Sequence, residues 1–466
     1  PVQPPPPPVP VSGVQSAKNI VILACFADHW DSGNSTVLSS EGRTDTNEYY
    51  NLFNETNHTA DGAVGSVRDY YREVSYNKLT IQSIVTPWVQ LPQNEAYYGT
   101  DGGTRDLAWK EMVTNAIAAA EAAGFDFSQG DSDGDGWVDC LTVIHSGHGQ
   151  EYTGNPATCI WSKQGEMNTV ITNDSVKMKR CHTEPALRGA TTSTSIIRIG
   201  VICHEMGHFF GLPDLYDYSS STYGIGYWGI MASGSWNGTD GKRPAHFCAW
   251  SKCMLGFVAP IQMRAQTNAT LPRVEDTAVV HLYRDGVTNA EYFLVENRSK
   301  TGFDNDSAIF PGLVLYHVDS KSANNDLGAW PHPAVKIEEA DGDNSLGGKT
   351  AYSEAGDVWT SSSGLSGGFR DQTAVQSANA MMYQSGAYNR SDDAAYYSYV
   401  RLTNVSAAAS NMTYDAITLR PRVYDQTSTN SSYTVRWGAC SEATQYELQE
   451  GASSPLTNFF DGAEGA

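Results

Sequence analysis

Apolar residues in the first half of the chain fall into runs that alternate between strand and helix periods. The segment KNIVILACFAD, at the start of the folded sequence, is rich in apolar and β-branched residues and predicts a buried strand. The segment GSVRDYYREVSY follows a polar loop and predicts a helix. Ser66 and Asp69 have the spacing of a capping box, so we expect this helix to begin directly after Ser66. Its apolar face should carry Val67, Tyr70, Tyr71 and Val74.

Four further segments continue this alternation. KLTIQSIVTPWVQLP predicts a strand broken at Pro87, since proline cannot donate a hydrogen bond to a sheet. Residues 105–123 predict a helix that stops at Gly124. CLTVIHSGHG predicts a strand that runs into a glycine-rich turn, and IIRIGVICHEMGHFFG predicts a helix ended by Gly211 and Pro213. The helix at 105–123 should bury Trp109, Val113, Ile117 and Ala120 on one face.

The pattern changes near residue 263, where short β-type runs begin to alternate with polar loops. AVVHLY, EYFLVEN, GLVLYHVD and YSYVRLTNV are of this kind, so the second half is β-rich. Beyond it, SSYTVRWGACSEATQYELQE holds about two strands, too few for a free-standing sandwich. We therefore expect an α/β (α+β) fold in four parts: a proline-rich linker at 1–17, a mixed domain at 18–262, a β-rich companion domain at 263–420 and an incomplete β-sandwich module at 421–466.

The charge of the chain excludes two classes of partner. Asp and Glu number 52 against 30 Lys and Arg, a net charge of −22 that repels nucleic acid and anionic lipid. No run of eighteen apolar residues occurs, so we expect no membrane span. The low charged fraction, with abundant Gly, Ser, Thr, Asn and Tyr, favours a secreted protein. The chain opens with PVQPPPPPVP and not with a signal peptide, so we expect that the targeting segment of a secreted form has been removed or left out of this sequence.

The eight cysteines are too few for a disulfide scaffold in a chain of this length. No CxxC pair occurs, which excludes a structural zinc ribbon. Cys25, Cys140 and Cys203 lie in apolar segments and should be buried thiols. Cys159 and Cys181 flank a possible hairpin, so we predict a disulfide between them.

The segment HEMGHFFGLPD carries the most informative chemistry. On a helix, His204 and His208 lie one turn apart on one face, so both imidazoles can reach one Zn²⁺. Glu205 is then placed to touch a zinc-activated water rather than the metal, and to act as its general base and acid. A bare HExxH pattern also arises by chance on helices, so the surrounding sequence has to support this interpretation.

A third zinc ligand should lie just beyond this helix. No Glu occurs between Met206 and Val274, so a ligand from a downstream helix is improbable. Gly211 can turn the chain back, which brings Asp214 to the place where the HExxHxxGxxH pattern of metzincins has its third histidine. We therefore predict Asp214 as the third ligand, with Asp217 and Asp240 as alternatives.

Met231 supports the same arrangement. It lies in the glycine-rich segment GIMAS after Asp214, where a metzincin Met-turn would place an apolar floor beneath the zinc ligands. Taken alone, Met231 fits a plain core residue better than a Met-turn. We expect the walls of the substrate site to come from the loops around 144–161 and 227–236.

The segment DSDGDGWVD predicts a calcium site. Asp131, Asp133, Asp135 and Asp139 stand at positions 1, 3, 5 and 9 of an EF-hand-like loop, with glycine at position 6 and the Trp137 carbonyl at position 7. Position 12 is not Glu and a strand follows, so the helix pair of an EF-hand is absent. The alternative is an acidic surface turn. FDNDS at 303–307 and EEADGDNS at 338–345 could also hold cations, although solvated loops are the commoner use of such segments.

Several of these segments together resemble the immune inhibitor A family of secreted bacterial metallopeptidases. They are GSVRDYYREVSYNKLTI, DSDGDGWVDCLTVIHSG, HEMGHFFGLPDLYD, WGIMASGSWNG, RPAHFCAWSKCMLGF and EYFLVENRSKTGFD. The resemblance covers roughly residues 18–420. It implies an exported zinc endopeptidase that is stabilised by calcium and made as a zymogen, with a metzincin-like peptidase domain at 18–262. The final segment is similar to the start of a fibronectin type III-like module.

The residues and the resemblance together predict a secreted, extracellular zinc metalloendopeptidase that acts on proteins or peptides, and we expect a monomer. Zn²⁺ would be the catalytic metal and Ca²⁺ a structural one. No tyrosine of the usual Met-turn kind follows Met231, so a tyrosine partner for the reaction is not predicted. The alternatives are a peptidase of the same metal type with a narrow substrate, and an adhesion or binding protein that keeps a protease-like scaffold. The intact His204, Glu205 and His208 favour the enzyme.

Overall fold

The computed structural model of the chain describes residues 15–99, 105–284, 291–329, 332–362 and 400–418, together with seven short strands at 369–370, 382–383, 395–396, 423–428, 433–437, 446–450 and 457–462. The proline-rich start, Cys440 and much of the predicted terminal module lie outside the described residues. Among the residues that are described, no helix combines the length and the apolar composition needed to cross a membrane.

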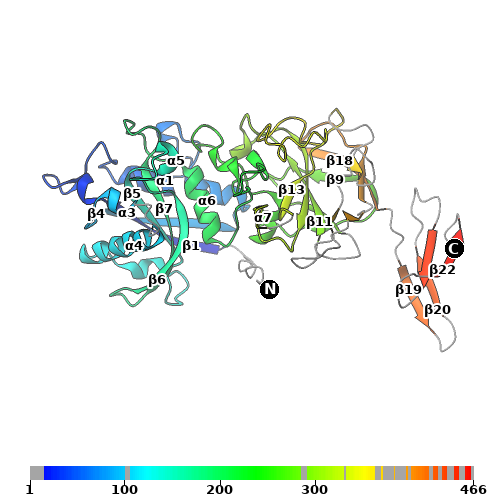
Figure 1. Cartoon of the computed structure of the whole chain (residues 1–466), viewed down its shortest axis with the longest axis horizontal. Coiled ribbons are helices and arrows are strands. Elements are labelled where there is room, and N and C mark those ends of the chain that lie inside the picture. The colour runs from blue at the N-terminus through cyan, green and yellow to red at the C-terminus, as the bar shows by residue number, and fades with distance from the viewer. Residues whose placement is uncertain are drawn as a thin grey trace.

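A five-stranded sheet organises the first half of the chain (Figure 1). Its strand order is β4-β1-β5-β7-β6. Neighbouring strands are parallel except for β6, which runs antiparallel to β7 at one edge. The strands are β1 (Gln15–Cys25), β4 (Leu79–Gln90), β5 (Cys140–His148), β6 (Lys163–Ile171) and β7 (Lys177–Leu187). A two-stranded ribbon, β2 (Trp30–Asp31) and β3 (Thr36–Val37), follows β1.

Strand β1 is buried on both faces, as its continuous apolar run predicts. Ile20, Ile22 and Ala24 pack into a core with helix α4 (Arg105–Ala122), and the alternate residues Val21, Leu23 and Cys25 pack into a second core on the opposite face. The predicted apolar face of α4 is confirmed, because Trp109, Val113, Ile117 and Ala120 all lie in the first of these cores.

The second face of the sheet is covered by α1 (Asn47–Asn54), α2 (Val67–Val74) and α6 (Ile199–Phe209). The predicted capping box is confirmed, since Asp69 N donates to Ser66 Oγ and Ser66 N donates to Asp69 Oδ2. The remaining helices are short: α3 (Glu95–Tyr98), α5 (Gln150–Thr153) and α7 (Ala249–Met254), with 3-10 turns at Ala27–His29, Ala60–Gly62, Phe127–Gly130, Gly226–Trp228, Ser233–Trp236 and Gly302–Asp304.

Two local predictions are wrong. Strand β4 continues through Pro87, because the pairing with β1 shifts register there and Leu23 N donates instead to the hydroxyl of Thr86. The predicted Cys159–Cys181 disulfide is absent, and both residues are free thiols. The β6–β7 hairpin pairs Cys181 with Gly165, and Cys181 faces the core beneath α4, which leaves Cys159 in the preceding loop.

Two antiparallel sheets form most of the β-rich half. One has the order β13-β12-β11-β10-β8, in which only β8 pairs in parallel, and the other has the order β14-β17-β18-β9. Their facing side chains make a third core. The strands are β8 (Ile261–Gln262), β9 (Gln266–Pro272), β10 (His281–Arg284), β11 (Glu291–Arg298), β12 (Gly312–Asp319), β13 (Val335–Ile337), β14 (Phe369–Arg370), β17 (Val400–Thr403) and β18 (Asn411–Thr418).

Six further strands form separate pairs. These are β15 (Met382–Tyr383) with β16 (Ala395–Tyr396), β19 (Val423–Ser428) with β20 (Tyr433–Trp437), and β21 (Tyr446–Glu450) with β22 (Thr457–Gly462). The last four strands lie within the predicted terminal module. Its likeness to a fibronectin type III module remains a prediction.

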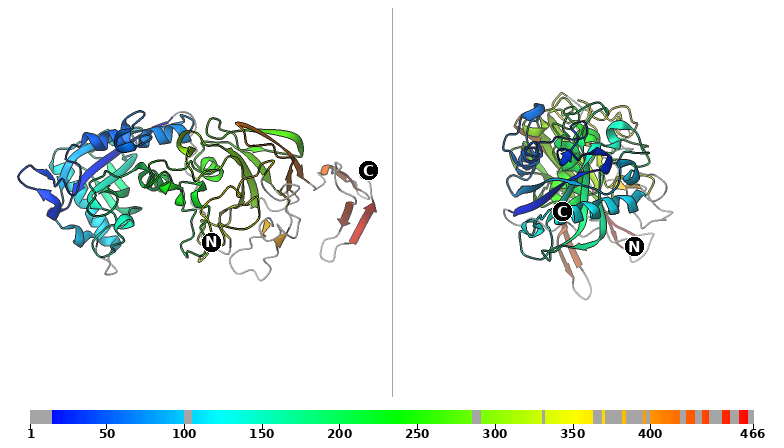
Figure 2. Two further views of the ribbon diagram at one scale, coloured as in Figure 1. Left: turned by 90° about the horizontal axis from the view of Figure 1, so that it is seen from above. Right: turned by 90° about the vertical axis from the view of Figure 1, so that its left-hand side faces the viewer.

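One core crosses the boundary predicted at residue 262. Met206 of α6 and Trp228 belong to the same buried cluster as Val314 and Tyr316 of β12. The green helices α6 and α7 accordingly lie toward the middle of the molecule, between the first sheet and the β-rich half (Figures 1 and 2). The helix with the HExxH motif is therefore supported from both sides.

Candidate metal centre

Helix α6 holds the HExxH residues in a buried setting. Every residue from Ile199 to Gly207 is buried, so the helix has no polar face toward solvent. Gly211 follows with a φ of 95°, in the left-handed region that favours glycine. The chain therefore turns back directly after the helix, as the sequence predicts, and brings Asp214 toward the two histidines.

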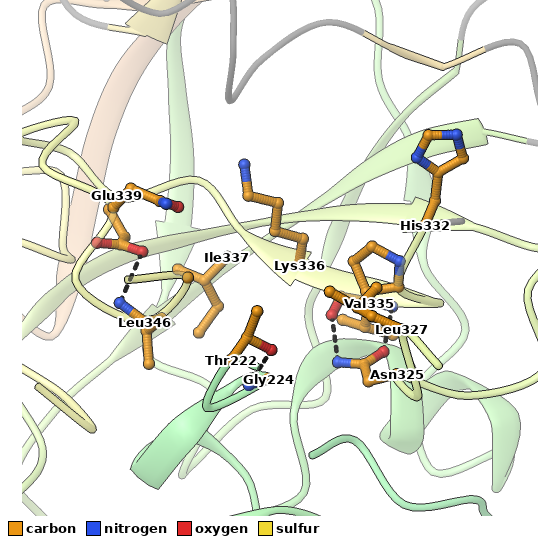
Figure 3. Close-up of a pocket in the computed structure, with 13 residues that line it drawn as sticks. Thr222, Gly224, Asn325, Leu327, His332, Val335, Lys336, Ile337, Glu339 and Leu346 are labelled. Carbon is orange, nitrogen blue, oxygen red and sulfur yellow. Dashed lines mark hydrogen bonds between the residues drawn. The ribbon is translucent and has the colours of Figure 1, made fainter. Parts of the chain in front are cut away.

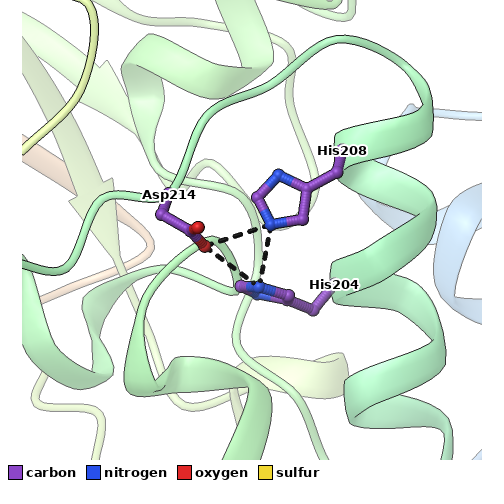
Figure 4. A group of neighbouring side chains, drawn as sticks. All are labelled: His204, His208 and Asp214. Carbon is purple, nitrogen blue, oxygen red and sulfur yellow. Dashed lines mark hydrogen bonds and ion pairs between the residues drawn. The ribbon is translucent and has the colours of Figure 1, made fainter. Parts of the chain in front are cut away.

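Three side-chain atoms converge at the end of this turn (Figure 4). The Nε2 atoms of His204 and His208 are 3.1 Å apart, and Asp214 Oδ1 lies 3.2 Å from the first and 3.1 Å from the second. Ligands bound about 2.0–2.1 Å from a tetrahedral zinc lie about 3.3 Å from one another. The three atoms therefore match one face of such a tetrahedron, and the fourth corner is left for a water or a substrate.

Backbone carbonyls fix the orientation of both imidazoles. The Nδ1 atom of His204 lies 2.7 Å from Ile230 O, and Nδ1 of His208 lies 2.7 Å from Leu212 O. A carbonyl can only accept, so each Nδ1 carries a proton, and each ring presents a lone pair at Nε2 once that nitrogen is deprotonated. This is the tautomer that a metal requires of a histidine ligand.

The three facing atoms of His204, His208 and Asp214 form a group that suits a bound cation. The Nε2 atoms of both imidazoles and Asp214 Oδ1 face one another, and Oδ1 is buried without a hydrogen-bond partner. Burial disfavours a charged imidazole, yet Asp214 and Glu205 raise the pKa of His204 to about 9, because the site favours positive charge. The two imidazoles in turn hold the pKa of Asp214 well below its usual range despite its burial.

The structure supplies an outer contact that the sequence does not predict. The hydroxyl of Tyr218 donates to Asp214 Oδ2, the carboxylate oxygen that faces away from the histidines. Tyr216 lies nearby, with its ring stacked on His204 at 6.4 Å between centroids. Both tyrosines follow Asp214 in the segment LPDLYDYS, but nothing in its composition indicates that their side chains turn toward His204 and Asp214.

Met231 lies beneath helix α6. Its side chain is buried and its Sδ packs against Gly207, between the two histidines in sequence. Its carbonyl accepts a hydrogen bond from Leu215 N at 2.7 Å, which ties the segment to the chain just after Asp214. The Met231 side chain therefore lies against the helix that carries His204 and His208.

Glu205 faces a cleft of about 250 Å³ beside the three converging atoms. Within the described part of the chain its carboxylate has no hydrogen bond or ion pair, so it is free to accept a proton. The cleft is walled by the aromatic rings of Trp161, Tyr216 and Trp236. Trp161 and Trp236 come from the two loops predicted to line the substrate site, and Tyr216 comes from the turn after Asp214.

Two other glutamates surround Glu205, and neither is apparent from the sequence. Burial raises the pKa of Glu151 to about 7, partly offset by hydrogen bonds from Ser162, and the charge of Glu205 raises it further. Glu184 is completely buried, which raises its pKa well above the usual range, again with a contribution from Glu205. The carboxyl of Glu184 lies 2.7 Å from His182 Nδ1.

The two alternative ligands are engaged elsewhere. Asp217 accepts hydrogen bonds from the backbone of Ser219, Ser221, Thr222 and Leu327, which shape the following loop. Asp240 forms an ion pair with Arg188 at 3.1 Å. Asp214 is the carboxylate that the structure brings to His204 and His208.

The acidic loop at 131–139 forms a tight turn at the surface. Oxygens of Asp131, Asp133 and Asp139 lie within 4.8 Å of one another, close enough to share a cation. Asp135 is outside that group, and its carboxylate caps Trp137 N at 2.8 Å. Gly136 has a φ of 83°, which fits the sharp bend expected at the sixth position.

Known proteins resemble the part of the chain that contains this site. The family model described as "Immune inhibitor A peptidase M6, catalytic domain" matches residues 9–257, more than half of the chain. The chain is 29% identical over 269 residues to the pre-pro-metalloprotease PrtV of Vibrio cholerae serotype O1, covering 51% of this chain and 29% of that protein. It is 32% identical over 219 residues to Immune inhibitor A of Bacillus thuringiensis subsp. alesti, covering 41% of this chain and 32% of that protein.

The chain thus spans about a third of the length of these relatives. The matched region includes the first sheet, the HExxH helix and the segment around Met231. From the family match and its extent, the chain belongs to the immune inhibitor A family of M6 peptidases.

Proposed function

We propose that this chain is a zinc-dependent endopeptidase that hydrolyses peptide bonds of extracellular proteins. The observation that carries the proposal is the convergence of His204 Nε2, His208 Nε2 and Asp214 Oδ1 at mutual distances of 3.1–3.2 Å beside a free Glu205. These three residues would hold the metal in a metzincin-like arrangement, with Met231 below them. The relatives named metalloprotease and Immune inhibitor A support the same class of reaction.

Peptide hydrolysis at this site would combine a metal-activated water, Glu205 and the aromatic walls of the cleft. Zn²⁺, when bound, polarises the scissile carbonyl and lowers the pKa of water to about 7. Glu205 accepts the proton of the attacking water on its carboxylate and then donates it to the nitrogen of the departing amine. Trp161, Tyr216 and Trp236 flank the substrate in the cleft and limit access of bulk water.

The wider setting of the enzyme follows from the sequence. The composition supports an exported protein, and we expect it to act outside the cell as a monomer. The loop at 131–139 would bind a structural Ca²⁺ through Asp131, Asp133 and Asp139, with Asp135 and the Trp137 carbonyl completing the predicted set. We expect protein or peptide substrates and no nucleic-acid partner.

A casein hydrolysis assay tests the proposal. The zinc-loaded chain should be active, should lose activity with a chelator and should regain it when Zn²⁺ is restored. Glu205→Gln should lower turnover by about 10²-fold or more while one zinc per chain remains bound. Glu166→Gln, which changes an exposed carboxylate paired with Lys179, is the matched control.

Activity that is unaffected by chelation, or undiminished in Glu205→Gln, would refute the proposal. A chain that binds zinc but shows no hydrolysis of any protein substrate would instead support the adhesion or binding interpretation.

A further inference from the structure

A second cluster of carboxylates lies in the β-rich half, between β13 and the bridge that pairs Leu313 with Trp359. Its oxygens form two overlapping groups that share Glu339, and within each group all lie within 4.8 Å of one another. One group opens to solvent and the other is internal. The five members are Glu339, Asp341, Asp343, Glu354 and Asp357.

The internal part of this cluster is buried without a countercharge. Asp357 has no exposed surface and Glu339 is 6% exposed. Among the described residues, no Lys, Arg or His forms an ion pair with any of the five carboxylates. The FDNDS segment behaves differently, because its buried Asp304 pairs with Arg298 at 2.7 Å. Burying like charges together without a cation is unfavourable. Asp304 has the guanidinium of Arg298 as its countercharge, whereas the described residues offer no such cation to the cluster.

One oxygen of Asp357 is available to a ligand. Oδ2 accepts hydrogen bonds from Trp228 Nε1 at 2.7 Å and from Glu354 N at 2.9 Å. Oδ1 is buried and has no hydrogen-bond partner, and the same holds for Glu354 Oε1. Buried polar atoms normally find a partner, so two orphaned oxygens from neighbouring acids indicate a missing cation.

The electrostatics agree with this geometry. Burial raises the pKa of Glu339 to about 8, and the charge of Asp357 raises it further. Burial also raises the pKa of Asp357 to about 6, with contributions from Glu354 and Asp341. The protein thus holds these acids close together although it disfavours their charge.

We infer that Glu339, Glu354 and Asp357 bind a Ca²⁺ ion from inside the fold, and that Asp341 and Asp343 complete the site from its open side. Calcium takes six to eight oxygens at about 2.3–2.6 Å, so two ligands on opposite sides of one ion are about 5 Å apart. Oxygens within 4.8 Å of one another can therefore share that ion. Mg²⁺ demands a smaller, more regular octahedron and retains its waters, which fits a five-carboxylate cluster less well.

The site would join the two halves of the protein. Besides the bond from Trp228 to Asp357, Tyr227 N donates to Tyr352 O at 2.9 Å and Tyr223 N donates to Leu346 O at 3.0 Å. Figure 3 shows Glu339 accepting the backbone N–H of Leu346 at one end of a pocket of about 270 Å³. The loop that would surround the cation is thus also hydrogen-bonded to residues 223–228.

The segment held by these hydrogen bonds is next in sequence to a residue that contacts His204. Ile230 lies just beyond residues 223–228, and its carbonyl orients the imidazole of His204. A cation at the cluster would therefore stabilise the segment that positions His204. This positional role rests on the proposed function, whereas cation binding at the cluster does not.

Terbium luminescence and calcium competition test the site. The zinc-loaded Glu205→Gln chain avoids self-digestion, and adding Asp131→Asn and Asp133→Asn removes the other acidic loop. In this background we expect one saturable Tb³⁺ site that is sensitised by Trp228 and displaced by Ca²⁺. Asp341→Asn with Asp343→Asn should weaken Ca²⁺ binding by about tenfold or more. Glu354→Gln with Asp357→Asn should abolish it.

The matched control is Asp276→Asn with Glu166→Gln, which neutralises two exposed carboxylates that are paired on the surface and should leave binding unchanged. Ca²⁺ should raise the melting temperature of the background chain and not that of the cluster variants. If the internal pair of substitutions prevents folding, the exposed pair at 341 and 343 decides the outcome. Absence of saturable binding in the background, or equal affinity in the Asp341 and Asp343 variant, would overturn the inference whether or not the chain hydrolyses protein.

Discussion

The sulfur of Met231 lies against the backbone of Gly207, so close that a β-carbon on Gly207 would stand 2.5 Å from it. Glycine is a poor helix former, yet Gly207 occupies the interior of α6 between His204 and His208. The contact explains this choice, because only a residue without a side chain lets the thioether approach the helix beneath the two histidines.

Gly207→Ala should therefore destabilise the protein. Helix propensity favours alanine by about 1 kcal/mol, but overpacking a buried contact costs about 1–3 kcal/mol, so we expect a net loss of about 1 kcal/mol and weaker zinc binding. Denaturant unfolding of the zinc-loaded chain measures the free energy of unfolding, and competition with a chromogenic chelator measures the zinc affinity. Met231→Ala in the same chain should recover part of the loss. A Gly207→Ala protein more stable than the parent would show that the contact is not tight.

Replacing the third ligand should remove the metal. Among the described residues, Asp214 is the one carboxylate whose oxygen lies between the two imidazoles, and Asp214→Ala leaves two histidines, which alone make a weak zinc site. Elemental analysis after dialysis should give about one zinc for the parent and far less for the variant. Asp240→Ala, which breaks a remote ion pair with Arg188, should keep its zinc. Unchanged zinc in Asp214→Ala would move the third ligand elsewhere.

Tyr218→Phe should weaken zinc binding without abolishing it. Its hydroxyl donates to Asp214 Oδ2, and loss of such outer contacts typically costs 10–100-fold in metal affinity. Tyr218 is 52% exposed, so water can replace the hydroxyl and the effect should be near the lower limit, about tenfold. Chelator competition against Tyr50→Phe, an exposed tyrosine on α1, provides the comparison. Equal affinities would mean that Asp214 needs no support from Tyr218.

Glu151→Gln should alter how stability depends on pH. Burial first, and then the charge of Glu205, raise the pKa of Glu151 from an ordinary 4.5 to about 7. The folded state then holds a proton that the unfolded state releases, so this group removes stability as pH rises from 4.5 to 7. The variant should melt higher than the parent at pH 8 and show little difference at pH 4.5. A difference of the same size at both pH values would exclude titration of Glu151 as the cause.

Local features of the fold could be predicted because their causes are local. The capping box at Ser66, the end of α4 near Gly124 and the turn at Gly211 each depend on a few adjacent residues. The convergence of three side chains follows from the same logic, since a helix fixes the spacing of His204 and His208 and a glycine turn returns Asp214.

Long-range features escaped prediction. Cys159 and Cys181 look suitable for a bridge in sequence, but the hairpin register that separates them is set by cross-strand packing. Pro87 stays within β4 because Thr86 supplies an acceptor opposite Leu23, which no propensity reveals. Glu151 and Glu184 reach the surroundings of Glu205 from α5 and β7, so only the folded sheet shows that they are neighbours.

The buried guanidinium of Arg298 on β11 donates to the carbonyl of Trp228 at 3.0 Å, across the boundary predicted at residue 262. Recombination near that point would leave the buried guanidinium of Arg298 without this acceptor. It would also remove the side chains of the β-rich half that pack against the HExxH helix. The two halves are therefore expected to be inherited as one unit, and chimaeras that exchange the β-rich half between relatives should succeed only when residues 223–231 travel with it.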